Sequence, residues 1–170
     1  MKFENVTTQS KNVLLEMQKK NYWNFKGSLY FIILIFLSCV MLLLFFVRGI
    51  SYTNYLYVVL FGTFLILSIF LIIANPYLAS NRVIKNEGIT TVKMQFYDEY
   101  IFSINETTGT ETKRFYKIFT KMIITKNLLL LISRTNLLMY IIDKRNFTYG
   151  SAEDFLEFMK EKCPNIKIER

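Results

Sequence analysis

The densest run of basic side chains in this sequence lies between residues 113 and 121 and indicates a binding surface. Its members are Lys113, Arg114, Lys117 and Lys121, and Lys144-Arg145 forms a second, smaller cluster. Positive charge gathered in this way can steer an acidic partner toward one face of a protein. The plainer interpretation, a solvated strand face or one close to anionic headgroups, is favoured over nucleic-acid binding. Because no Gly-rich phosphate loop or nucleic-acid motif occurs, we predict no nucleic-acid partner.

Residues for catalysis and metal binding are scarce. The chain contains no histidine, which removes Ser-His and Cys-His dyads, histidine-containing zinc sites and the usual general base near neutral pH. Of the two cysteines, Cys39 falls inside an apolar run and Cys163 directly precedes Pro164, so we expect neither a disulfide nor a metal pair. No acidic cluster has the spacing of metal ligands. The sequence therefore predicts a protein that is not an enzyme and has no cofactor.

Two long apolar runs in the first half of the chain predict membrane spans at 29–47 and 55–74. Neither run contains a charged residue, and each can cross a hydrocarbon core of about 30 Å at ~1.5 Å per residue. As core helices of a soluble domain they would need cover on every side, which the rest of the chain could not supply. The outer loop at 48–54 is short, so we expect an antiparallel helical hairpin with almost nothing outside the membrane.

Lysine and arginine lie mostly on one side of the predicted spans. Arg82 and Lys85 follow the second span, and Arg48 alone lies in the loop. Four lysines lie within short reach of the start of the first span: Lys11, Lys19, Lys20 and Lys26. Because cytoplasmic flanks are enriched in these residues, we expect the chain in the inner (cytoplasmic) membrane with both termini in the cytoplasm.

The predicted spans offer no transport chemistry. Neither contains an acidic or basic side chain for a proton relay or an ion path, so a transporter is disfavoured. Gly62 has no small residue four positions away in either direction, and no small-xxx-small dimer seam is evident. Homo-oligomerisation therefore stays open.

Two polar segments flank the predicted spans. We expect residues 1–28 to be a cytoplasmic amphipathic segment, because Val13, Leu14 and Met17 fall at helical spacing beside the membrane. Asn75-Pro76 is expected to end the second span, since proline interrupts helices. Residues 75–87 are then a linker to the domain at 88–170.

Residues 88–170 alternate between strand patterns and turn residues. Turns are indicated by Asp98-Glu99, by Gly109, by a break near Lys117 and by Lys126-Asn127. Six short segments between them have strand character: 90–97, 100–104, two within 112–126, 128–133 and 137–143. The last two are continuous apolar runs, as in an antiparallel pair that is buried on both faces.

The period changes at 151–162, where the sequence predicts a C-terminal helix. Ser151 is a candidate N-cap, and Glu153 and Asp154 suit the positive helix start. The apolar face comprises Phe155, Phe158 and Met159, and Pro164 ends the helix. The expected fold is a membrane α-helical hairpin plus a small antiparallel β domain with a C-terminal helix.

Three short motifs mark the strand-rich half: F-Y-D-E-Y-I at 96–101, F-Y-K-I at 115–118 and I-I-D-K-R-N-F at 141–147. Together with two preceding spans and a final amphipathic helix, they resemble the YcxB-like family of bacterial membrane proteins. The resemblance implies a pleckstrin-homology-like (PH-like) cytoplasmic domain and supplies no activity or site residues. Phosphoinositide-binding domains of that shape need basic residues around the first hairpin. The turn here is Asp98-Glu99, so we do not expect a phosphoinositide ligand.

Three classes of function remain. The leading hypothesis is a non-enzymatic binding module, held at the bilayer, whose cytoplasmic domain captures a protein partner, as a regulatory or immunity-type protein does. The alternative is a membrane effector whose spans associate or permeabilise the membrane when a ligand binds. An enzyme ranks last. A toxin gene beside this one would favour immunity, and a nucleotide-signal synthase would favour an effector.

Overall fold

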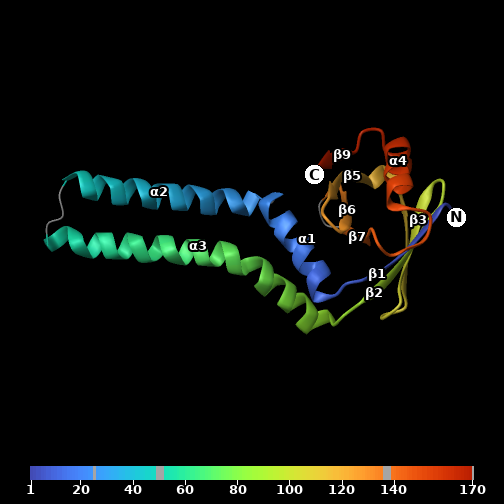
Figure 1. Cartoon of the computed structure of the whole chain (residues 1–170), viewed down its shortest axis with the longest axis horizontal. Helices are drawn as coiled ribbons and strands as arrows, with labels where there is room; N and C mark the ends of the chain where they lie inside the picture. Colours follow the sequence, from blue (N-terminus) through green and yellow to red (C-terminus); the bar gives the residue numbers. More distant parts are fainter. Residues whose placement is uncertain (25, 49–51, 136–138, 170) are drawn as a thin grey trace. The chain divides into compact units, whose positions relative to one another are not determined.

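The computed structural model describes residues 1–170 except 25, 49–51, 136–138 and 170 (Figure 1). The chain divides into two compact units. The first, called the β unit, combines Met1–Met17 with Arg82–Arg170, and the second, called the helical unit, comprises Gln18–Asn81. The helical unit is therefore an insertion in the sequence of the β unit.

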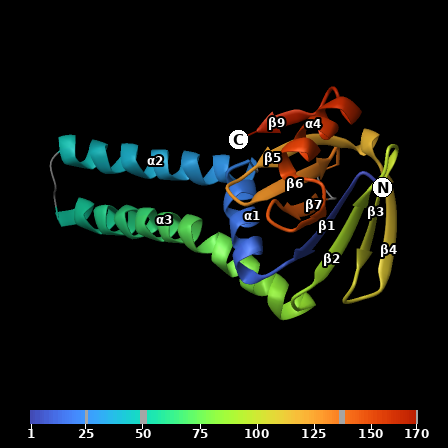
Figure 2. The same cartoon turned by 45° about the vertical axis from the view of Figure 1, so that its right-hand side comes forward.

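The inserted segment is helical throughout the part that is described. It contains the end of α1 (Lys11–Asn24), α2 (Lys26–Arg48) and most of α3 (Tyr52–Glu87), and both views show α2 and α3 side by side (Figures 1 and 2). Large apolar side chains point outward, so that Phe36 is 65% and Ile66 67% exposed. Such surface is unfavourable in water and favourable in lipid.

One helix is long and apolar enough to cross a membrane. It is α3 from Val58 to Glu87, and the predicted span at 55–74 lies largely within this stretch. In α2, the apolar stretch among the described side chains is Ile32–Leu44, which is shorter than a span.

Hydroxyl groups on the apolar helices are satisfied within their own helix. The side chains of Ser38, Thr63 and Ser68 each donate a hydrogen bond of 2.9 Å to a carbonyl about one turn earlier. Because these hydroxyls are paired locally, they do not require water or a second helix.

The predicted helix end at Asn75-Pro76 is wrong. Helix α3 continues through Pro76 to Glu87, so that residues 75–87, which the sequence indicated as a linker, are helical. Proline in a helix interior costs about 3 kcal/mol, and the last turns of α3 have compensating contacts. Val83 and Ile84 pack against the apolar core of the β unit, a contact that the local sequence does not reveal.

The β unit contains two sheets (Figure 2). The first is antiparallel with the strand order β4-β3-β2-β1-β8. Its strands are β1 (Phe3–Thr8), β2 (Thr91–Phe96), β3 (Tyr100–Asn105), β4 (Thr110–Phe115) and β8 (Phe147–Tyr149). The second sheet has the order β7-β6-β5-β9, in which β5 and β9 run parallel. It consists of β5 (Phe119–Ile124), β6 (Leu128–Ser133), β7 (Met139–Asp143) and β9 (Lys167–Glu169).

The predicted strands correspond to β2 through β7, and the break near Lys117 is a single 3-10 turn, η1 (Tyr116–Ile118). Strand β1, by contrast, lies in a segment for which the sequence predicts no strand. Its buried positions alternate, but two of them are Asn5 and Thr7, which conceal the apolar period. Its partner β2 lies beyond the whole helical insertion, with pairs from Phe3↔Phe96 to Thr8↔Thr91.

The two faces of the second sheet belong to different cores. On one face, Leu129 and Leu131 pack with residues of the first sheet and of α4 (Ala152–Lys162). On the other face, Leu128, Leu130 and Ile132 contact Val13 and Leu14 of α1 and the end of α3. Every residue of β6 is buried, which explains its continuous apolar sequence.

The predicted C-terminal helix is confirmed as α4. Asp154 donates its backbone N–H to Ser151 Oγ at 3.1 Å, so Ser151 is the N-cap. Phe155 and Met159 are fully buried, and Phe158 is partly buried. The helix therefore covers the core that contains Leu129 and Leu131.

Candidate functional site

The four basic residues that the sequence singles out lie on three consecutive elements of the β unit. Lys113 and Arg114 are on β4, Lys117 is on η1, and Lys121 is on β5. Strand β4 is at the edge of the first sheet, and five of its six residues are exposed. A charged edge strand also protects a sheet from pairing with other chains.

The four residues differ in their surroundings. Lys121 Nζ lies 2.8 Å from Glu169 Oε2, and this lysine holds the pKa of the Glu169 carboxyl below its usual value through a hydrogen bond. Lys113 Nζ lies 3.7 Å from the centroid of the Tyr100 ring, a cation-π contact. Only Arg114 and Lys117 line a common pocket.

This pocket, called the basic pocket below, has a volume of about 520 Å³. It is lined by Arg114, Lys117, Ile118, Ser133, Arg134 and Thr135. The third cation, Arg134, was missed at the sequence level because it follows an apolar strand and lies in an expected turn. It reaches the pocket through tertiary structure, since its backbone N–H donates to the Ile118 carbonyl at 3.0 Å.

The three cations of the basic pocket form no ion pair among the described residues, although Asp98 and Glu99 line a neighbouring pocket together with Lys117. Among the described residues, neither Arg114, Lys117 nor Arg134 has a carboxylate oxygen within 4.0 Å. Two other basic residues of the β unit, by contrast, form ion pairs: Lys93 with Glu4 at 3.1 Å and Arg145 with Asp143 at 2.7 Å. The positive charge of the basic pocket is therefore left for solvent or a ligand.

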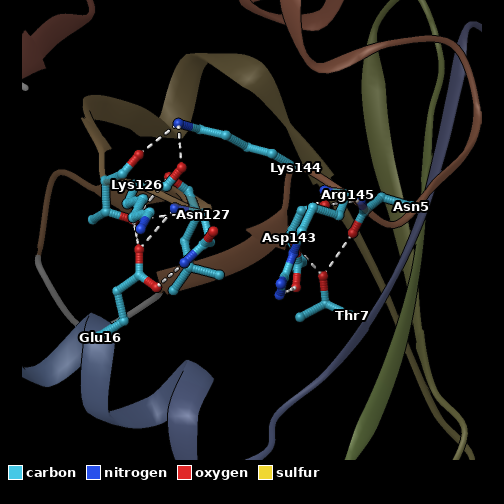
Figure 3. A network of polar contacts seen from close by, with 10 residues as sticks. Asn5, Thr7, Glu16, Lys126, Asn127, Asp143, Lys144 and Arg145 are labelled. Carbon is cyan, nitrogen blue, oxygen red and sulfur yellow. Dashed lines mark hydrogen bonds and ion pairs between the residues drawn. The ribbon is translucent and has the colours of Figure 1, made fainter.

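The second basic cluster serves the fold. Arg145 forms two side-chain hydrogen bonds with the buried carboxylate of Asp143, which lower the pKa of Asp143 below its usual value. Lys144 Nζ donates to the carbonyls of Thr125 and Lys126 at 2.5 and 3.3 Å (Figure 3). Both side chains are engaged, so Lys144-Arg145 is a poor candidate for ligand binding.

Buried polar groups join the two sheets at the same place. Asn5 Nδ2 donates to the Asp143 carbonyl at 2.8 Å, and the Asp143 N–H donates to Thr7 Oγ1 at 2.9 Å (Figure 3). Thr7 in turn donates to Asn5 Oδ1 at 2.6 Å. All three residues are buried, so this ring of hydrogen bonds satisfies groups that would otherwise be costly to bury.

Glu16 ties α1 to the turn between β5 and β6. Its carboxylate accepts hydrogen bonds from Thr125 Oγ1 and from the backbone and side-chain nitrogens of Asn127, at 2.6 to 2.9 Å (Figure 3). Burial alone would raise the pKa of Glu16, but these hydrogen bonds outweigh it and the pKa lies below its usual value. Its role is structural.

Cysteine and metal chemistry receive no support from the described residues. No group of three or more His, Cys, Asp or Glu side chains among them could hold a metal ion. Cys163 is buried and donates to the Tyr116 carbonyl at 3.4 Å, and burial raises the pKa of its thiol. Both cysteines are free. The buried thiol of Cys163 is of the unreactive kind.

The turn at Asp98-Glu99 needs a different interpretation. Since β1 precedes β2 in the sheet, this turn joins the second and third strands and is not the first connection. Asp98 also has Lys162 and Lys2 at 3.7 and 4.0 Å. Its acidic character is therefore no argument against a phosphate ligand elsewhere in the β unit.

Comparison with known proteins supports the predicted family. A family model described as "YcxB-like protein" matches residues 96–159, which include all three cations of the basic pocket. No curated protein and no solved structure matches the chain. Residues 96–159 are thus similar to the YcxB-like family, as the sequence motifs predicted.

Proposed function

We propose that this chain is a non-enzymatic binding module of the cytoplasmic membrane, whose β unit binds an acidic protein partner in the cytoplasm. The observation that carries the proposal is the exposed, unpaired positive charge of Arg114 and Lys117 at one edge of the β unit. Charge that is not used for folding increases the association rate with an acidic surface. A regulatory or immunity-type role fits such a module.

In this proposal α2 and α3 both cross the membrane, with the two termini on the cytoplasmic side. Support comes from the outward apolar side chains of both helices and from the lysine and arginine residues that flank them. The β unit is proposed to be PH-like. The support is its order of four antiparallel strands, three further strands and a helix, β1–β4, β5–β7 and α4, with β8 and β9 as additions.

Affinity capture with a charge-reversed variant tests the partner. The full-length chain, purified from its own cells in a non-ionic detergent, should recover an acidic protein at low salt. The double variant Arg114→Glu, Lys117→Glu should lose this protein, because repulsion replaces attraction at the binding surface. We leave Lys121 unchanged, since its reversal would place a second negative charge beside Glu169.

The matched control is the double variant Lys126→Glu, Lys160→Glu, which changes the net charge equally at exposed positions outside the basic pocket. It should retain the partner. If both variants lose the captured protein equally, the interaction depends on net charge alone. If both recover it equally, Arg114 and Lys117 do not bind the partner. Either result contradicts the proposed surface.

The alternative function, a membrane effector, is favoured by one observation. The helical unit is inserted between β1 and β2, which pair directly, and Gln9 donates its N–H to the Thr90 carbonyl at 2.8 Å. A ligand-induced change at these strands would act on both ends of the inserted helices. This connection makes the effector the second candidate.

A further inference from the structure

The basic pocket is lined by charges of one sign. Its described charged residues are Arg114, Lys117 and Arg134, and no acidic side chain lines it. Its volume of about 520 Å³ lies within the range of roughly 300–1,000 Å³ that is typical of small-ligand sites. A concave site of this size accommodates a small molecule or a headgroup better than a flat protein surface.

A strand, a 3-10 turn and the turn after β6 hold the cations in place. Arg114 lies in the ladder between β3 and β4, where it is opposite Ile101. Lys117 belongs to the single turn η1, and Arg134 is attached to that turn by the hydrogen bond from its backbone to Ile118. A pocket that is lined by several like charges favours the binding of an anion.

The uncharged lining residues complement the cations. The Thr135 hydroxyl lies 3.2 Å from Ser133 Oγ and can donate to a phosphate oxygen. Ile118 and the aliphatic stems of the basic side chains provide apolar contact. No aromatic ring lines the pocket among the described residues, so a base-stacking site for nucleic acid is absent there.

We propose that the basic pocket binds the phosphate group of a small phosphomonoester, either a soluble molecule or a lipid headgroup. Two guanidinium groups offer planar pairs of donors that match phosphate oxygens, and the lysine adds a third positive charge. A dianionic phosphate balances three cations better than a single carboxylate does. The inference rests on the proposed function in so far as both place binding at Arg114 and Lys117, and Arg134 distinguishes them.

The test is calorimetric titration of the full-length protein with phenyl phosphate, in nanodiscs of phosphatidylcholine. Saturable binding is expected. Arg134→Gln should weaken the affinity for phenyl phosphate about tenfold or more, since a charge-assisted hydrogen bond is lost. The affinity of Arg134→Lys should lie between those of the wild type and Arg134→Gln. The matched control is Lys113→Gln, which removes one charge next to the basic pocket but not from its lining, and should change the affinity less than about twofold.

Nanodiscs that also contain phosphatidic acid distinguish the two sources of the phosphate group. A lipid ligand would occupy the basic pocket and abolish phenyl phosphate binding in these discs, whereas a soluble ligand would bind equally in both. Absence of binding to the wild-type protein in phosphatidylcholine discs overturns the proposal. Equal weakening by Arg134→Gln and Lys113→Gln also overturns it, because the binding would then be unspecific attraction.

Failure of this inference and failure of the proposed function give different results. If the wild-type chain captures an acidic protein but does not bind phenyl phosphate, only the phosphate site is refuted. Phosphate binding without any captured protein would leave the phosphate site intact and refute the protein partner.

Discussion

Among single residues, Phe155 of α4 lies at the centre of a cluster of aromatic rings. Phe155 is fully buried, and its ring centroid lies 4.6 Å from that of Phe96 and 5.5 Å from those of Phe3 and Phe147. These rings come from β1, β2 and β8. One side chain of α4 therefore holds together three strands that are distant in sequence.

We predict that Phe155→Ala lowers the free energy of unfolding by about 3–5 kcal/mol, because it removes buried surface and leaves a cavity. The measurement is urea unfolding of the full-length protein in non-ionic detergent, followed by circular dichroism. Glu157→Ala, at an exposed position of the same helix, is the control. A loss no larger than that of the control would contradict this packing.

Glu16 provides a prediction that depends on pH. Its pKa is lowered in the folded protein from an ordinary value of 4.5, so its ionised form stabilises the fold above that pH. This contribution is lost as the pH falls through the folded pKa. Glu16→Gln should therefore cost about 1–2 kcal/mol at neutral pH and progressively less below pH 4.5.

The check on Glu16 is the difference in unfolding free energy between wild type and variant, measured from pH 7 down to pH 3. The pKa of Asp143 is also lowered, so its protonation destabilises both proteins in this range. This loss of stability is common to wild type and variant and cancels in the difference. Glu157→Gln serves as the control. A difference that does not depend on pH would exclude the ionised carboxylate as the stabilising group.

At the scale of elements, the order of strands explains how the helices are attached. β1 and β2 are neighbours in one sheet, so the chain leaves this sheet at Thr8 and returns to it at Thr91 on paired strands. Both ends of the insertion adjoin the core formed by the other face of β6. Val13 and Leu14 belong to it at one end, and Val83 and Ile84 pack against it at the other. Both ends of the insertion therefore start from the same part of the β unit, which places them on the same side of a membrane if α2 and α3 both cross it.

We predict that Ser51→Cys is labelled from outside intact cells and that Glu106→Cys is labelled only after lysis. Both variants carry Cys39→Ala and Cys163→Ser, and serine keeps a donor for the Tyr116 carbonyl. A membrane-impermeant maleimide is the reagent. Glu106 is preferable to Gly109 in the same turn region, because the Gly109 φ of +70° disfavours any side chain. Labelling of Glu106→Cys in intact cells would refute the topology.

At the scale of the whole molecule, the question is whether the helical unit only anchors the β unit or also acts on the membrane. Its described apolar helices carry no Asp, Glu, Lys or Arg side chain from Ile32 to Leu44 or from Val58 to Asn81, and the hydroxyl groups of Ser38, Thr63 and Ser68 are paired within their own helix. A water-filled path through such helices would be unfavourable. Anchoring is the simpler role.

We predict that liposomes containing the full-length protein retain a trapped dye, both alone and after addition of phenyl phosphate. Liposomes without protein give the background. Leakage that requires phenyl phosphate and is absent with Arg134→Gln would establish the effector in place of the binding module. Leakage from the protein alone would also favour the effector.

Local sequence was sufficient wherever a feature depends on neighbours along the chain. The apolar runs, the turns at Asp98-Glu99 and Gly109, and the Ser151 cap of α4 follow from periodicity and from the chemistry of single residues. The continuous apolar sequence of β6 likewise predicted a strand that is buried on both faces. The basic residues at 113–121 were visible for the same reason.

Tertiary structure alone decided the features that join distant parts of the chain. The strand β1 is stabilised by a partner more than 80 residues away, α3 continues beyond Pro76 where Val83 and Ile84 find a core, and Arg134 joins Arg114 and Lys117 across two sheets. Lys121 and Lys144 resemble the pocket cations in sequence but are engaged by Glu169 and by carbonyls. Whether a basic side chain is free depends on which groups the fold brings to it, and periodicity carries no information about contacts at such separations.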